Sequence, residues 1–90
     1  MDRFSLVVLG STLELATDAM PSDNHPRVAD CAKIIREYID LPHSHDENEL
    51  RQAVTELADL ARQNHEFLIS GRLRDFVRQL GGRREKSDVA

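Results

Sequence analysis

The chain has 90 residues, enough for one domain with a modest hydrophobic core. Hydrophobic residues make up 40% and charged residues 31% of it, which is typical of a folded chain and not of a disordered one. The single cysteine, Cys31, excludes an intramolecular disulfide framework, so we expect a cytoplasmic protein. The apolar run at residues 4–9 is too short for a secretion signal, and no segment reaches membrane-spanning length.

The net charge of −4 is unevenly distributed along the chain. Residues 1–66 hold six basic and thirteen acidic side chains, a net charge of −7. Residues 67–90 hold six basic and three acidic side chains, a net charge of +3. The sequence therefore predicts an acidic body followed by a basic segment.

The first predicted element is a helix over residues 2–20, ended by Pro21. The apolar start of this segment also suits a strand, but no other segment offers that strand a partner. Gly10 disfavours a helix by about 1 kcal/mol. Helical spacings of three and four nevertheless connect a row of apolar residues: Leu6, Leu9, Leu13, Ala16 and Met20.

A second helix is predicted over residues 26–41. Pro26 suits the first position of a helix, where its missing N–H costs nothing, and Pro42 ends the segment. The expected buried face consists of Val28, Cys31, Ala32, Ile35, Tyr38 and Ile39.

A third helix is predicted over residues 46–68. Two overlapping signals could cap its start, Ser44 with Glu47 and Asp46 with Glu49. Its expected buried stripe consists of Leu50, Ala53, Val54, Leu57, Leu60 and Ala61.

A fourth helix is predicted over residues 71–80, because its apolar residues are out of phase with those of the third. The later stripe, Ile69 to Leu80, is displaced by about one residue, or roughly 100°. We expect a break at Ser70-Gly71, with Asn64 as the alternative position.

The predicted fold is all-α, a small antiparallel bundle of four helices in a single domain of residues 1–82. Gly81-Gly82 is expected to end the last helix. Residues 83–90 are polar without an apolar period, so we expect a flexible basic tail.

The first helix carries more apolar residues than one buried face needs. Val8 and Leu15 fall outside the core stripe, and surplus apolar surface usually marks an interface. The alternative is a central helix that is buried nearly all round. We predict a partner or homodimer interface that contains Phe4, Val8, Leu9, Leu15 and Met20.

Arg72, Arg74 and Arg78 are candidate contacts for an anion or a partner. Arginines on a helix followed by a basic arm are one way to bind phosphates, so a nucleic-acid-binding regulator is the alternative function. The acidic body would repel a polyanion, however, and basic residues near a helix C-terminus also complement the helix dipole. We therefore do not expect nucleic acid to be the partner.

The loop before the third helix holds the candidate metal ligands His43, His45 and Asp46. Structural zinc sites need about four ligands and catalytic ones about three. Because these three residues are a poor match, we expect solvated histidines and no metal or other cofactor, and keep metal binding as a second alternative. If His25 and His45 approach acidic groups, a response to pH follows.

Sequence motifs for catalysis are missing. Cys31 falls in an apolar stripe, which favours a small core side chain over a nucleophile. There is no serine elbow, phosphate loop or dinucleotide fingerprint. We expect a small protein-binding or regulatory protein that is not an enzyme, of the adaptor, inhibitor, immunity or antiactivator type. We expect it to act through a helical surface, as a homodimer, without a membrane partner.

Overall fold

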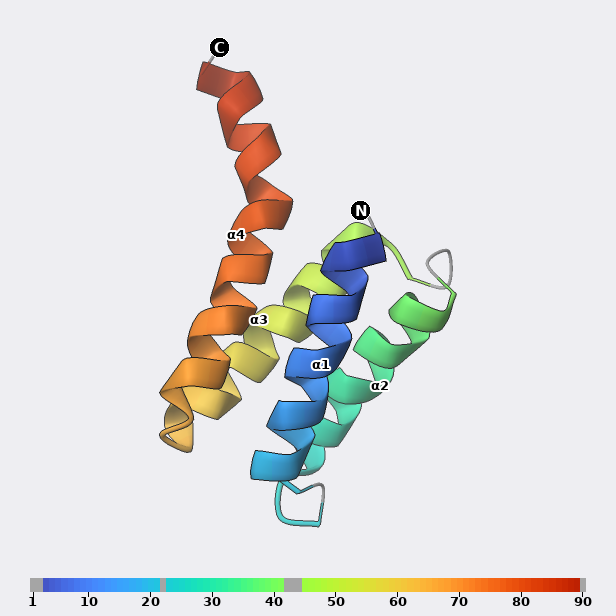
Figure 1. Cartoon of the computed structure of the whole chain (residues 1–90), viewed down its shortest axis with the longest axis vertical. Coiled ribbons are helices and arrows are strands. Elements are labelled where there is room, and N and C mark those ends of the chain that lie inside the picture. The colour runs from blue at the N-terminus through green and yellow to red at the C-terminus, as the bar shows by residue number, and fades with distance from the viewer. Residues whose placement is uncertain (1–2, 22, 42–44, 90) are drawn as a thin grey trace.

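A computed structural model describes the backbone of residues 3–21, 23–41 and 45–89, and the side chains of residues 4–21, 23–41 and 45–80. Over this part of the chain there are four helices and no strand, which confirms the all-α prediction. Successive helices reverse direction along the chain (Figure 1). Their bounds are α1 (Arg3–Ala19), α2 (Pro26–Asp40), α3 (Glu47–Gln63) and α4 (Phe67–Val89).

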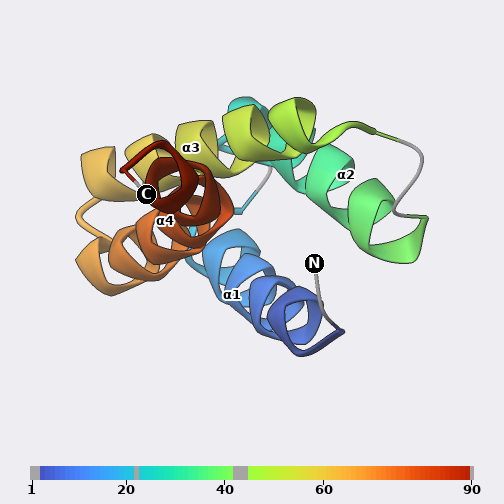
Figure 2. The ribbon, with the colours of Figure 1, turned by 90° about the horizontal axis from the view of Figure 1, so that it is seen from above.

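The four helices form a closed ring around one interior. Each helix contacts its neighbour in sequence, and α1 also contacts α4. Viewed from above, α1 and α3 lie on opposite sides of this interior, with α2 and α4 between them (Figure 2). The arrangement is an antiparallel bundle, so every helix has one face toward the centre and one toward solvent.

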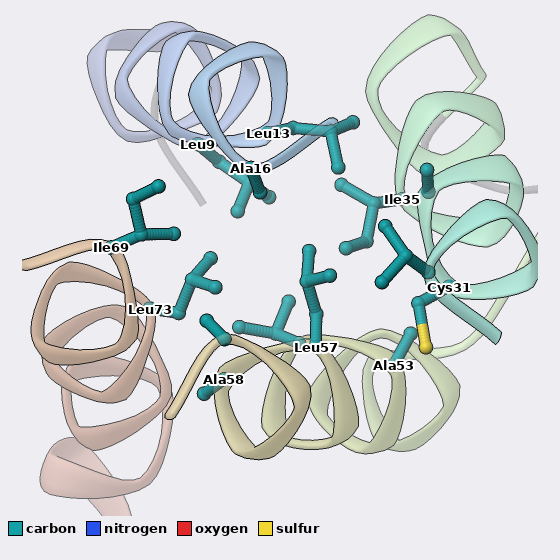
Figure 3. Close-up of a cluster of buried hydrophobic side chains, with 14 of the residues drawn as sticks. Leu9, Leu13, Ala16, Cys31, Ile35, Ala53, Leu57, Ala58, Ile69 and Leu73 are labelled. Carbon is teal, nitrogen blue, oxygen red and sulfur yellow. The ribbon is translucent and has the colours of Figure 1, made fainter. Parts of the chain in front are cut away.

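Side chains from all four helices meet in a single core (Figure 3). The rows that hydrophobic spacing predicted are buried, with Leu60, Tyr38, Ile39 and Leu80 packed at the edge of the core. The exception is Leu6, which is only partly buried and borders the groove between α1 and α2. Ala58 joins the core as an unpredicted member. The largest fully buried side chains are Leu9, Leu13, Met20, Ile35, Leu50, Leu57 and Leu73.

The predicted start signals of α2 and α3 are found at the helix ends. Pro26 occupies the first turn of α2. At α3, the Asp46 carboxylate accepts a hydrogen bond from the backbone N–H of Glu49 at 2.8 Å, so the second of the two predicted signals caps this helix. Ser44, in the other signal, lies outside the described residues.

The break between the third and fourth helices lies at residues 64–66, and the prediction of Ser70-Gly71 is wrong. His65 has a φ of 64°, in the left-handed region. Its N–H donates to the Arg62 carbonyl at 3.0 Å, and the N–H of Glu66 donates to the Ala61 carbonyl at 2.8 Å. This pair of bonds is the Schellman motif, which closes a helix C-terminus. The alternative position, Asn64, is therefore the correct one, and α3 ends five residues before the predicted Leu68.

Ser70 and Gly71 remain inside α4, since one glycine costs a helix interior only about 1 kcal/mol. The helix begins at Phe67 instead of residue 71, and its backbone continues to Val89, past the expected end at Leu80. The side chains of the predicted flexible tail, residues 83–90, lie outside the described ones, and that prediction is not tested. No helix in the described part of the chain has the length and apolar character needed to cross a membrane.

Candidate interaction surface

The helix α1 has two apolar faces, of which only one belongs to the core. Leu9 and Met20, predicted as interface residues, are almost completely buried inside the bundle. They therefore pack in the monomer and are removed from the candidate surface. Their helical spacing places them in the core stripe, so they cannot also belong to the exposed interface.

The other three predicted interface residues do lie on the surface. Phe4 is 75% exposed, Leu15 46% and Val8 43%. On a helix with 100° per residue, these three positions fall within about 40° of one another. Ser11 is exposed on the same line, so the row carries no charge from residue 4 to residue 15. We call Phe4, Val8, Ser11 and Leu15 the outer row of α1.

The outer row lies away from α2. A Cβ atom built on Gly10 would lie 3.7 Å from Ile39 of α2, which shows that the Gly10 side of α1 faces that helix. Gly10 is roughly 120° around the helix from Phe4. Val7, also exposed, lies beside the row and borders an open groove of about 610 Å³ between α1 and α2. The outer row is therefore not on the side of α1 that packs against α2, although Ser11 reaches the edge of this groove.

A second exposed apolar pair, Phe67 and Leu68, lies at the start of α4 and was not predicted from the sequence. Their side chains are 62% and 72% exposed. The expectation that helix three continued to residue 68 hid them, because only the break at residues 64–66 places them in a first helical turn. The spacing of the buried α4 residues could have revealed this pair. Counting back from Ile69 at helical spacing places both Phe67 and Leu68 outside the buried face.

The three candidate arginines of α4 do not form one basic patch. Arg72 and Arg74 lie roughly 160° apart around the helix. Arg74 donates to the Asp59 carboxylate of α3 at 2.9 Å and, through Nε, to the Ser70 hydroxyl at 3.4 Å. Arg78 lies 3.8 Å from Asp75 on its own helix. Two of the three charges thus have an acidic neighbour, which weakens the case for phosphate binding.

The candidate metal ligands are only partly described. His43 lies outside the described residues. Both ring nitrogens of His45 are within hydrogen-bonding distance of carboxylates, so each already has a partner within the protein. Asp46 caps α3. Among the residues that the structure describes, no three histidine, cysteine, aspartate or glutamate side chains are placed to hold a metal.

Cys31 lies in the core between α2 and α3 (Figure 3). Its thiol donates a hydrogen bond to the Glu56 carboxylate at 3.0 Å, and Arg27 pairs with the same carboxylate. Burial, followed by the hydrogen bond to Glu56, raises the pKa of Cys31 to about 12. The hydrogen bonds from Cys31 and then Arg27 lower the pKa of Glu56. Since thiolates are the reactive form, this environment opposes a nucleophilic role for Cys31.

Comparisons of the chain with protein-family models, with curated proteins and with solved structures find no match.

Proposed function

We propose that this chain is a protein-binding domain of the adaptor or regulator type, and that the outer row of α1 pairs with a second copy. The observation that carries the proposal is the exposure of Phe4, Val8 and Leu15 in one uncharged line. Removing apolar surface from water stabilises a complex by roughly 25 cal/mol per Å². The centre of a protein interface is depleted in charge and enriched in aromatic and apolar side chains.

A second copy is favoured over a foreign partner by charge. Residues 1–66 have a net charge of −7, so most faces of two copies would repel each other. A two-fold interface brings the same patch of each subunit together. The patch must therefore not be repelled by an identical copy of itself. The outer row satisfies this requirement because it has no charge.

A dimer would leave the outer face of α3 uncovered, and α3 has four acidic and two basic side chains. An excess of exposed carboxylates on α3 complements a basic partner surface and speeds association with it. This supports a regulatory role in which pairing through α1 presents two acidic surfaces at once. The single cysteine, Cys31, is compatible with a reducing compartment such as the cytoplasm.

The experiment is a light-scattering mass measurement on the wild type, Val8→Asp and Gln52→Asp. We expect the wild type at twice the mass of one chain and Val8→Asp at the mass of one, because a carboxylate buried without a partner is strongly unfavourable. Gln52 is exposed on α3, so Gln52→Asp adds the same charge elsewhere and should stay dimeric. Circular dichroism checks that each variant is helical. A monomeric wild type, or a dimer that survives Val8→Asp, contradicts the proposal.

A further inference from the structure

One histidine joins the end of α2 to the start of α3. The ring of His45 lies between two carboxylates, with Nε2 at 2.8 Å from Oε1 of Glu37 and Nδ1 at 2.6 Å from Oε2 of Glu49. Glu37 belongs to the last turn of α2 and Glu49 to the first turn of α3. The His45 side chain is 19% exposed, so the ring is largely covered but still open to protons from solvent.

This geometry needs a proton on each ring nitrogen. An ionised carboxylate accepts hydrogen bonds and donates none, and a neutral imidazole has one N–H only. With one N–H, one of the two close contacts would set a nitrogen lone pair against a carboxylate oxygen. We infer that His45 is a proton-operated clip, which holds the α2–α3 corner closed while the ring is an imidazolium and releases it when the ring loses a proton.

The charges around the ring agree with this inference. The hydrogen bond with Glu37 and then that with Glu49 raise the pKa of His45 above its ordinary value, while partial burial opposes them. Among the residues that the structure describes, Glu37 is the charged group in contact with the ring from α2, and Glu49 is the one from α3. The ordinary value is about 6.5. Because the folded state holds the proton more tightly, the clip stabilises the fold fully below that pH and loses its effect as the pH rises through the folded-state pKa.

Release of the clip need not unwind either helix. The Asp46 carboxylate still caps α3 through the N–H of Glu49, and the N–H of Leu41 still donates to the Glu37 carbonyl at 2.8 Å. Both of these bonds use groups that the His45 ring does not occupy. The expected change is therefore a looser corner between two intact helices. It involves none of the outer row of α1 and does not rest on the proposed function.

The first test is an NMR titration of the His45 ring. We expect a midpoint above about pH 6.5 in the wild type and a lower midpoint in Glu37→Gln and in Glu49→Gln, because each removes one negative charge but keeps an acceptor oxygen. Glu47→Gln is the matched control: it removes a charge from the same helical turn, at a residue without a described contact to His45, and should leave the midpoint nearest the wild-type value. A wild-type midpoint at or below about 6.5, or one that neither Glu37→Gln nor Glu49→Gln lowers, overturns the inference.

The second test measures the consequence for stability. Urea unfolding of the wild type and of His45→Gln is followed at several pH values from about 5.5 to about 8.5. We expect the wild type to have the higher midpoint at the acidic end and its advantage to shrink as the pH rises. Glutamine can accept and donate a hydrogen bond but does not titrate in this range. A difference between the two proteins that is constant across the series, or that grows toward high pH, overturns the inference.

Discussion

The helices α1 and α3 have the same length and meet the same core, but they differ in their outer faces. The exposed positions of α3 are polar or charged, so the helix completes its packing within the chain. The exposed positions of α1 include Phe4, Val7, Val8 and Leu15. The comparison shows that apolar residues on a helix divide into those that the bundle needs and those that it leaves in water. The second group is what points to another molecule.

The largest effect expected from this comparison is at Leu57, which α3 buries completely. Leu57→Ala should lower the free energy of unfolding by about 3 kcal/mol, because the buried side chain loses its isopropyl group and a cavity remains. Leu15→Ala makes the same chemical change on the outer row and should cost less than about 1 kcal/mol when the chain is monomeric. Urea unfolding of both variants at low protein concentration provides the measurement. Equal losses would show that Leu15 packs within its own chain.

The capped start of α3 provides the next effect. Asp46→Ala removes the acceptor of the Glu49 N–H and should cost about 1 kcal/mol, measured by thermal or urea unfolding. Asp46→Asn keeps a side-chain oxygen at the same place and should lose a smaller part of this stability. Equal loss in both variants would mean that the negative charge, and not the hydrogen bond, is what matters at this helix end.

The other end of α3 should allow a gain. His65 has a left-handed backbone without being a glycine. His65→Gly should raise the free energy of unfolding by roughly 0.5 kcal/mol, since glycine adopts this region without steric cost but loses more chain entropy on folding. His65→Ala, which removes the ring and keeps the Cβ atom, should bring no such gain. A destabilised His65→Gly would indicate that the edge contact between His65 and Phe67 outweighs the backbone term.

The smallest effect at neutral pH concerns the thiol between α2 and α3. With the pKa of Cys31 raised to about 12 from 9.0, the folded state keeps the thiol proton that the unfolded chain loses. Stability should therefore fall as the pH rises above about 9, and Cys31→Ala should be less sensitive in that range. A thiol reagent should also label the folded protein more slowly than the unfolded one. Fast labelling of the folded protein would contradict the assigned environment.

The sequence predicted the fold well because each buried row repeats at helical spacing. The rows around Leu13, Ile35, Leu57 and Leu73 are all found in the core. The break between α3 and α4 could not be located in the same way. Glycine is the usual residue at a left-handed helix end, whereas the chain uses His65 there and keeps Gly71 inside a helix.

The candidate surfaces were predictable only in part. Phe4, Val8 and Leu15 were recognised because they exceed what one buried face needs, while Phe67 and Leu68 depended on the position of the break. The possibility that His45 approaches acidic groups could be stated from the sequence. Its partners could not be named, because Glu37 lies eight positions away on another helix and reaches the ring only through the turn between α2 and α3.

The central claim, that the outer row of α1 pairs with a second copy, is tested most directly by following backbone amide NMR signals on dilution. From about 1 mM to about 10 µM, a range that spans weak and moderate association, we expect the amides of Phe4, Val8 and Leu15 to shift together. The amides on the exposed face of α3, such as that of Gln52, should stay in place. Shifts confined to the start of α4, or no shift anywhere with the mass of one chain throughout, would contradict the account.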